Sequence, residues 1–567
     1  MSNEQKAMNK KRLLSRRAQK PTGAFANLGS FLLSAFCSPG KSLRLDEQGF
    51  LLPALLSFII AMGIISGAVL EIILNNFTVV GNNVTSQKAF NIAEAGVNYY
   101  LWHLSHNATD FKDGQSTPVT PDPTLGYGPY VHNYVDADAI NEGTYTLYVK
   151  PQSSGSTIAT VRSIGKVKGS SITRTISAQI GASSFASYGV VSDSALWFGS
   201  DETADGPVHS NQGVRMDGQS NATVSSANTT YTPPYANGGC LGGNCSHPGV
   251  WCDTSVTTPV DCNTRDKSNW QFPTTQVDFN QVSTSLCTMK KAAFASDSST
   301  AALATRSNAC SQTPGTRTAA YIPQRSSSFN TSRGYLIELN QDDTYNLYDV
   351  NNVKDAKTVG YANALTMQTV ATNIAIPSSG VVFAEDNVWV RSNPTFHGRV
   401  TIASGRLATS YTTDLSVADN LAYSTKDGSD AIGLVAEGNV YISSFAPPAT
   451  SSFTLEVDAA VLAESGSVEY PSNYTFSDNT CTRGWINNNQ TLNFYGSVAT
   501  RQTWTWSWQL GSSCGDAVKD TSSGYYISGF KYNTTHYDYN LQYAPPPSYP
   551  ITGGYNILSW REILTKP

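Results

Sequence analysis

Acidic side chains in turns are the residues of this sequence best suited to catalysis. Five lie in short runs containing Gly, Asn, Asp or Gln, namely Asp342, Asp343, Glu385, Asp386 and Glu437. Two carboxyl groups facing each other across a groove can act as general acid and base in polysaccharide cleavage. Turns also favour acids, because carboxylate oxygens accept hydrogen bonds from nearby backbone N–H groups. We therefore interpret these five as solvated turn residues.

Calcium is the metal ion that the same region could bind, because Ca²⁺ prefers oxygen ligands. The oxygen-bearing residues that lie close together are Gln341, Asp342, Asp343, Asn346, Asp349 and Asn351. Their spacing does not match an EF-hand loop, and the chain contains no H-E-x-x-H or phosphate-binding-loop motif. We predict that the protein is not an enzyme and requires no cofactor, with Ca²⁺ as a candidate ion.

Three tryptophans near the C-terminus could bind a surface. Trp504, Trp506 and Trp508 alternate with Thr and Ser, so their indoles would share one face of a strand. One interpretation is that they pack in the core or cap the last repeat. The other is an exposed platform for a carbohydrate or another surface.

Cysteines divide unevenly along the chain. Of nine, Cys37 precedes a long apolar run and the other eight follow it: Cys240, Cys245, Cys252, Cys262, Cys287, Cys310, Cys481 and Cys514. An even number is typical of disulfides in an oxidising compartment, and up to four are expected here. The wide spacings make a structural zinc site a weaker interpretation.

The apolar run itself, residues 50–74, is long enough to cross a bilayer as a helix. Residues 1–49 carry nine basic and three acidic side chains, whereas the chain as a whole has a formal charge of −5. The positive-inside rule places residues 1–49 in the cytoplasm and the remainder outside. Residues 50–567 have no excess of basic side chains, which disfavours nucleic-acid binding. Apolar residues continue at helical spacing to His106, predicting one helix over residues 50–106.

The order of these features resembles a known family. A basic leader, a Gly49-Phe50 junction, an apolar helix and the AEAG sequence ending at Gly96 are similar to the N-terminus of type IV pilin-like proteins, particularly PilX-type minor pilins. The resemblance implies that a prepilin peptidase cuts after Gly49 and that Phe50 becomes methylated. It also implies partners, namely other pilin subunits along the helix and an inner-membrane assembly machinery.

One position departs from the family pattern. The usual glutamate at the fifth mature position is Ala54 here. In pilins that carboxylate neutralises the terminal ammonium of a neighbouring subunit inside an apolar core, where an unpaired charge is costly. A subunit with Ala54 is better suited to the filament tip, where one neighbour is missing.

The remaining chain reads as β structure. Runs 144–150, 158–168 and 172–180 alternate as in an antiparallel sheet, and Ser163-Ile164-Gly165 resembles a step in the PilX-type middle strand. Residues 107–140 read as a loop, and 333–350 as a hairpin turning at 341–343.

Repeated pairs of short strands beyond residue 183 suggest a β-helix or related β-solenoid. An irregular β-sandwich with many hairpins is the alternative. The predicted fold is α+β, with these parts: leader 1–49, transmembrane and assembly helix 50–106, pilin-like sheet 107–182, solenoid-like region 183–480 with a Cys-rich insertion at 219–330, and C-terminal β segment with a Pro-rich tail 481–567.

These features together predict a minor pilin of a type IV pilus or pseudopilus. It would begin as a single-pass membrane protein and then display a surface-binding domain at the filament tip, against an unknown surface or glycan. An uncleaved membrane-anchored adhesin is the first alternative. A β-helix carbohydrate-active enzyme is the second.

Overall fold

The structure is a computed structural model of the 567-residue chain. It describes residues 51–107, 110–115, 120–151, 158–234, 245–296, 309–313, 315–325, 330–354, 359, 361–408, 411–446, 454–471, 491–510, 526–530 and 532–563. The chain divides into two compact units, residues 1–81 and 82–567. The fold is α+β, with a long N-terminal helix followed by a large β-rich region that contains disulfides.

The long helix is α3, Leu51–His106. Pro53 lies in its first turn, where a missing N–H breaks no helical hydrogen bond. Every side chain from Leu52 to Val84 is exposed, whereas the last part of α3 buries one face. The buried positions recur every three or four residues: Ala89, Ile92, Ala93, Val97, Tyr100 and Leu104. The predicted helix is thus confirmed.

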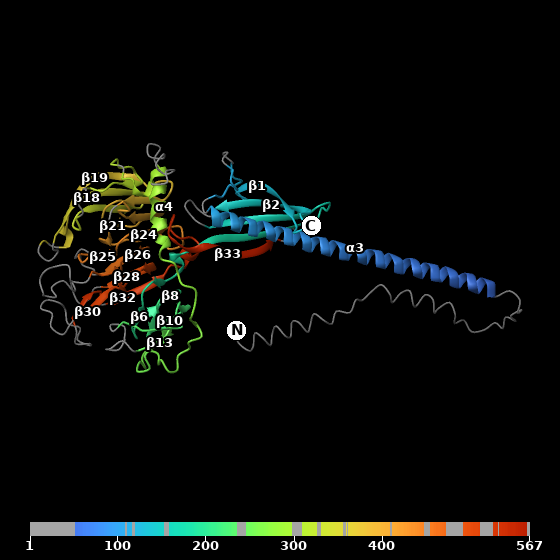
Figure 1. The fold of residues 1–567 in the computed structure, drawn as a ribbon, viewed down its shortest axis with the longest axis horizontal. Helices are drawn as coiled ribbons and strands as arrows, with labels where there is room; N and C mark the ends of the chain where they lie inside the picture. The colour runs from blue at the N-terminus through green and yellow to red at the C-terminus, as the bar shows by residue number, and fades with distance from the viewer. Residues whose placement is uncertain are drawn as a thin grey trace. The chain divides into compact units, whose positions relative to one another are not determined.

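That buried face packs on a five-stranded antiparallel sheet, visible along the blue helix in Figure 1. Its strands, in spatial order, are β1 (Tyr127–Val135), β2 (Asn141–Pro151), β3 (Ala159–Val167), β4 (Thr173–Ser184) and β33 (Ile551–Ile563). The three predicted runs are confirmed as β2, β3 and β4. Two expectations are wrong: β1 lies in the predicted loop, and the C-terminal strand β33 belongs to this sheet.

Small residues let the helix and the sheet approach closely. A Cβ atom on Gly165 of β3 would lie 2.1 Å from the Ala89 carbonyl oxygen and 2.4 Å from the Ala93 nitrogen. A Cβ on Gly96 would lie 2.3 Å from the Ser163 hydroxyl oxygen. Real Cβ contacts are not this short, so these positions require glycine. The AEAG sequence of α3 and the Ser163-Ile164-Gly165 step of β3 therefore pack directly against each other.

Between β4 and β33 the chain forms the β-rich region, residues 185–550. An eleven-stranded, all-parallel sheet contains β5 (Val190–Ser192), β8 (Val208–Ser210), β11 (Val224–Ser226), β15 (Trp270–Gln271), β16 (Tyr321–Ile322), β20 (Val381–Ala384), β22 (Arg399–Ser404), β24 (Ala431–Ala436), β26 (Thr454–Ala463), β28 (Thr491–Thr500) and β32 (Tyr532–Tyr537).

An eight-stranded sheet contains β17 (Gly334–Asn340), β18 (Thr344–Val353), β19 (Leu365–Ala375), β21 (Val388–Asn393), β23 (Leu415–Val417), β25 (Val440–Ile442), β27 (Val468–Glu469) and β29 (Trp504–Thr505). β17 and β18 form the predicted hairpin, with the turn at 341–343. From β17 through β21 to β29 the pairing is parallel.

Smaller elements complete the region. They are the parallel trio β6 (Leu196–Phe198), β9 (Val214–Met216) and β14 (Val250–Trp251), and the pairs β7 (Thr203–Ala204) with β10 (Gln219–Ser220), β12 (Thr230–Tyr231) with β13 (His247–Pro248), and β30 (Ser507–Leu510) with β31 (Tyr526–Gly529). The helical elements are α4 (Gln281–Ala295) and the short η1 (Phe185–Ser187), η3 (Ala309–Ser311), η4 (Tyr361–Asn363) and η6 (Tyr539–Gln542).

Successive passes of the chain stack on one another. From β20 to β29, each pass places one strand in the eleven-stranded sheet and the next in the eight-stranded sheet, as β20 and β21 or β24 and β25 do. The first passes differ, because β5 and β8 are followed by β6 and β9 of the parallel trio. Equivalent positions align in register, so that Ala384, Ser404, Ala436 and Ala463 form one row. These consecutive strands are not hairpin partners, as an irregular sandwich would require.

The stack does not follow sequence order. The eleven-stranded sheet runs β15-β11-β8-β5-β28-β26-β24-β22-β20-β16, with β32 beside β28. The chain begins in the middle of this sheet with β5 and adds strands outward to β15 at one edge. It then crosses to the opposite edge, where it forms β16, and adds strands back towards the middle until β28 lies beside β5. Its last pass meets its first, where β28 pairs with β5. We call the boundary between these two passes the seam.

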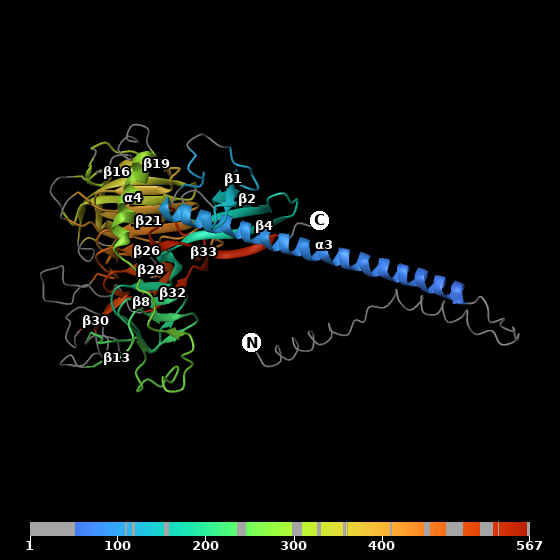
Figure 2. The same ribbon diagram turned by 45° about the vertical axis from the view of Figure 1, so that its right-hand side comes forward.

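Strands in the stack bury both faces. In β20, Val382 and Ala384 point into the interior core, while Val381 and Phe383 belong to a second cluster under α4. Figures 1 and 2 show α4 lying over this sheet. Burial on both sides explains the apolar runs in these segments.

The predicted Cys-rich insertion at 219–330 is wrong in its first half. β10, β11, β14 and β15 continue the stack rather than interrupt it. Within the described residues, disulfides join Cys252 to Cys262 and Cys287 to Cys310, and Cys245 is also disulfide-bonded. Cys37, Cys240, Cys481 and Cys514 lie outside the described residues.

Candidate functional site

The exposed part of α3 carries the residues that the sequence predicts to mediate assembly. Within the described chain, α3 is the helix long and apolar enough to span a membrane, with a mean hydropathy of 2.3 in its most apolar window. Ala54 is exposed in the first turns of the helix. Gly49 and Phe50, the predicted processing residues, lie outside the described residues.

A large cavity opens at the seam. On the eleven-stranded side the seam is closed by hydrogen bonds between β28 and β5, but β29 and β6 do not pair, and neither do β32 and β7. The cavity between them has a volume of about 920 Å³, within the range of small-molecule sites. Its lining comes from both sides of the seam: Val190, Phe198, Asp201, Glu202, Thr203, Ala204, Asp205, Asn221, Trp504, Ser507 and 532–536.

Asp205 connects the two sides of the seam. Its carboxylate accepts hydrogen bonds from the side chain of Asn221, from the Tyr537 backbone N–H at 3.2 Å and from the Tyr539 hydroxyl at 3.1 Å. The His536 ring lies 3.3 Å away. These hydrogen bonds lower the pKa of Asp205 in spite of its partial burial. Asp205 therefore holds β32 against the first pass of the chain.

Glu202 also lines this cavity. Its carboxylate accepts a hydrogen bond from the Gly199 N–H at 2.6 Å. Burial raises the pKa of Glu202, and the neighbouring carboxylate of Asp201 raises it further, while the Gly199 hydrogen bond opposes the shift. Glu202 is thus more easily protonated than an exposed glutamate.

The three tryptophans do not form one exposed face. Trp504 is in β29 and Trp508 in β30, which belong to different sheets, and Trp506 between them is 4% exposed in the core. The Trp508 indole N–H donates to the Tyr470 carbonyl at 2.7 Å. Core packing is therefore the better interpretation for Trp506. Trp504 differs, because it lines the seam cavity and its buried indole N–H has no hydrogen-bond partner among the described residues.

Two of the five predicted turn acids are not solvated. Glu385 is 1% exposed and pairs with the Lys290 ammonium of α4, which is 0% exposed. Asp386 is 5% exposed and accepts from the Arg325 backbone N–H at 2.9 Å. Burial raises the pKa of both carboxyls. Glu385 is buried against Lys290 of α4, and Asp386 is buried against the segment that contains Arg325.

The other acids stay near the surface. Glu437 is half-buried and accepts from the Arg406 N–H at 2.7 Å, whereas Asp342 and Asp343 are exposed in the β17–β18 turn. Among the described residues, no three His, Cys, Asp or Glu side chains come together as a metal site. The predicted acids therefore do not converge on one groove.

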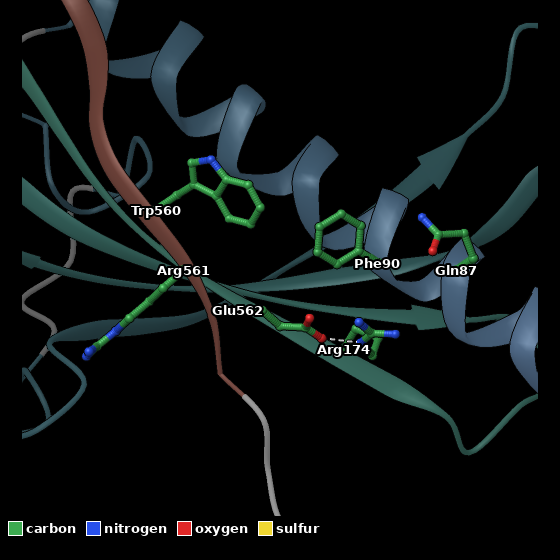
Figure 3. A pocket seen from close by; sticks show the side chains of 6 residues that line it. All are labelled: Gln87, Phe90, Arg174, Trp560, Arg561 and Glu562. Carbon is green, nitrogen blue, oxygen red and sulfur yellow. Dashed lines mark hydrogen bonds and ion pairs between the residues drawn. The ribbon is translucent and has the colours of Figure 1, made fainter. Parts of the chain in front are cut away.

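A second hollow, of about 440 Å³, lies beside α3 and β33. Figure 3 shows Phe90 and Trp560 side by side, Glu562 paired with Arg174, and Arg561 pointing away from the helix. The Arg174 guanidinium also lies 5.5 Å from the Phe90 ring centre. Trp560 is 60% exposed, so this aromatic and charged surface is open to solvent.

Sequence reasoning missed the seam residues Glu202, Asp205 and His536. Their only signal is chemical type, and positions 205 and 536 are more than 300 residues apart. Only the stacking of the first pass on the last brings them together.

Fold and sites define a class of protein with an apolar N-terminal helix, an antiparallel sheet packed on it and a β-rich insertion before the last strand. No family model and no curated sequence matches the chain. Among solved structures, it is similar to the competence-associated pilin ComZ from Thermus thermophilus, with 14% identity, a TM-score of 0.25, and coverage of 85% of this chain and 98% of ComZ. At that TM-score the similarity does not establish a common fold.

Proposed function

We propose that this protein is a pilin-like subunit, anchored by α3 and assembled into a type IV pilus or pseudopilus that displays residues 185–550. The observation that carries the proposal is the continuity of α3. Its first part exposes apolar side chains on every face, and its last part is the packing helix of the sheet. A simple anchor needs only about 20 apolar residues and no continuation into the fold.

The topology proposed for the membrane stage follows from charge and cysteines. The basic leader stays in the cytoplasm, and residues beyond α3 are outside. The disulfides Cys252–Cys262 and Cys287–Cys310 support this side, because such bonds persist in oxidising compartments.

We also propose that the subunit lies at the filament tip. Ala54 offers no carboxylate to a neighbour's terminal ammonium, and a shaft could hardly repeat a domain as large as residues 185–550 at every subunit. We further propose that this domain is a β-solenoid, supported by its parallel, in-register stacking, and that it binds an external surface.

The role proposed is structural and adhesive rather than catalytic. Glu385, the most buried of the candidate acids, is paired with Lys290, and Asp386 is occupied by backbone N–H groups. Incubation of the purified chain with a panel of polysaccharides should release no products. Release of products that Glu437→Gln abolishes would support an enzyme instead.

The proposal is tested by the N-terminus of the mature protein. We expect mass spectrometry to find a chain beginning at N-methylated Phe50, and Gly49→Val to leave the leader uncut. Gly40→Val, also in the leader, is the matched control and should be processed normally. An intact leader in the wild-type protein would support a membrane-anchored adhesin.

Position in the filament needs a separate measurement. Gold-labelled antibodies against residues 185–550, applied to sheared filaments, should mark one end of each filament. Labelling along the whole length would contradict the tip position but not the pilin role.

A further inference from the structure

The face of the five-stranded sheet that points away from α3 carries an excess of positive charge. Leu147 and Val161 pack on the α3 side, so the residues that alternate with them point to the opposite side. The register of the strands places four basic side chains there: Lys150, Arg162, Lys166 and Arg561. Figure 3 shows Arg561 pointing away from the helix. We call these four cations, with the side chains between them, the basic face.

Acidic side chains do not neutralise the basic face. The five strands contain two acids, Glu142 and Glu562. Glu142 is paired with the Lys88 ammonium of α3 at 3.2 Å, and Glu562 is paired with Arg174 on the helix side. Within the part of the chain that the structure describes, none of the four cations has an ion-pair partner. In a chain with a formal charge of −5, this face is therefore a local excess of positive charge.

Hydroxyl groups lie between the cations. Tyr148, Arg162, Ser177 and Arg561 form one row across β2, β3, β4 and β33. Thr146 lies in the next row of the same face. Among the described residues, the hydroxyl groups of Thr146, Tyr148 and Ser177 have no hydrogen-bond partner. The basic face therefore offers cations to an anionic group and hydroxyl groups to a polar one.

The cations are widely separated. Arg162 and Arg561 lie on either side of one strand, which places their backbones about 10 Å apart. Lys166 is four residues beyond Arg162 in β3, at a distance of about 13 Å. Double-stranded DNA carries one charge per about 1.7 Å of its axis. The basic face thus matches a polymer of much lower charge density.

A protein or a membrane surface is a poorer match. Protein interfaces usually bury aromatic or apolar anchors near their centre, and membrane-surface binding combines basic charge with exposed apolar side chains. Between the four cations, no described side chain is an exposed large hydrophobic. Separated guanidinium and hydroxyl groups instead suit a polysaccharide that carries carboxylate or sulfate groups.

We propose that the basic face binds an acidic polysaccharide. Arg162 and Arg561 pair with its carboxylate or sulfate groups, and the hydroxyl groups of Tyr148 and Ser177 form hydrogen bonds with its sugar hydroxyls. The inference rests on the proposed function, which places this sheet outside the cell. It deepens that function by naming a class of ligand and a surface for it outside residues 185–550.

The test is binding of the full chain, solubilised in a non-ionic detergent, to polysaccharides immobilised on a sensor surface. Hyaluronate supplies carboxylates, dextran sulfate supplies sulfates, and unmodified dextran is the neutral control. Duplex DNA and vesicles containing phosphatidylglycerol are the competing anionic probes. We expect at least one acidic polysaccharide to bind at about 50 mM salt, and this binding to weaken as added salt screens the charges.

Charge variants locate the binding surface. Arg162→Gln combined with Arg561→Gln should weaken binding by about tenfold. Glu142→Gln removes the acid of β2 and should strengthen it. The matched control is Arg333→Gln combined with Lys354→Gln, which removes two exposed cations of the β-rich region and should bind like the wild type.

Several results would overturn the proposal. They are no binding to either acidic polysaccharide, equal binding to unmodified dextran, tighter binding to DNA or to the vesicles, and an equal loss in the control variant. Unchanged binding by the Arg162 and Arg561 double variant would do the same, because the basic residues of segment 1–49 would then be responsible. Processing at Gly49 does not involve the basic face, so an uncut chain that binds would contradict the pilin role alone.

Discussion

At the scale of single residues, Glu469 illustrates how the stack perturbs an acid. It ends β27, and burial raises its pKa to about 7, with a contribution from Asp414 and opposition from a Ser467 hydrogen bond. Between its unfolded pKa of about 4.3 and pH 7, the native state holds the proton more tightly than the unfolded state. Stability contributed by the protonated group is therefore lost as pH rises through this window.

Glu469→Gln should remove that pH-dependent loss. We expect the free energy of unfolding in urea to rise by about 1–3 kcal/mol at pH 8 and to change little at pH 4. Glu94→Gln, at an exposed position of α3, is the control and should have little effect at either pH. An equal gain at both pH values would show that the carboxyl charge is not the cause.

The buried pair of Lys290 and Glu385 gives a second prediction. The ammonium also donates to the Cys310 carbonyl at 3.0 Å, so the pair joins α4, the η3 segment and the turn after β20. Glu385→Gln leaves the ammonium without its counter-charge and should cost about 3–5 kcal/mol.

Replacing both partners tests the origin of that loss. The double variant Lys290→Met with Glu385→Leu buries no charge, and it should recover most of the stability measured by thermal unfolding. If the double variant is as unstable as Glu385→Gln, shape rather than an unpaired charge is responsible.

These residues also show what sequence reasoning can reach. Turn positions for Glu385 and Asp386 follow from local composition, and they are correct. Their burial does not follow, because it depends on segments distant in the sequence. For Glu385 the segment is α4, which lies about 100 residues earlier, and for Asp386 it is the segment of Arg325, 61 residues earlier. Likewise, the sequence identifies Trp504 as a candidate surface-binding residue. Its place in a cavity depends on residues 198–205, which are distant in the sequence.

At the scale of elements, the contact between α3 and β3 depends on Gly165. A methyl group there would overlap the backbone at Ala89 and Ala93, which cannot move as a flexible side chain can. We expect Gly165→Ala to destabilise the helix–sheet unit by about 1–3 kcal/mol, as overpacking does.

The matched control is Gly553→Ala in β33, in the same sheet. A Cβ there meets nothing within 4 Å. Unfolding monitored by circular dichroism should separate the two variants. If both behave alike, close approach is not the reason for glycine at position 165.

The spacing of apolar residues and the lengths of the segments are sufficient to predict α3, β2, β3, β4 and the β17–β18 hairpin. Each of these elements is specified by its own residues. β1 was missed because Gly128 and Pro129 are typical of loops, whereas pairing with β2 decides its conformation. β33 was missed because its partner β4 is more than 360 residues away. Local pattern carries no information about such pairing.

At the scale of the whole molecule, the β-rich region begins and ends at one point of the sheet. Ser184 pairs with Ile551, and the Phe185 N–H donates to the Pro550 carbonyl at 3.0 Å. The order of the stack is consistent with this, since its first and last passes adjoin at the seam. A repeat pattern in the sequence reveals the passes but not that the chain starts in the middle of them.

Because its ends meet, residues 185–550 should be removable as a unit. Replacing them with Asn-Gly would join β4 to β33 by a two-residue hairpin turn, whose twist matches that of antiparallel strands. The five-stranded sheet and its contact with α3 would remain, and every cysteine after the apolar run would be gone. We expect this shortened chain, in detergent, to unfold cooperatively and to be cut after Gly49 like the full protein.

Residues 185–550, produced alone under oxidising conditions, should also fold, with the Cys252–Cys262 and Cys287–Cys310 bonds formed. Aggregation of the shortened chain, with the excised region still folded, would mean that the sheet depends on what is inserted into it. Subunit and displayed domain would then be one folding unit rather than two.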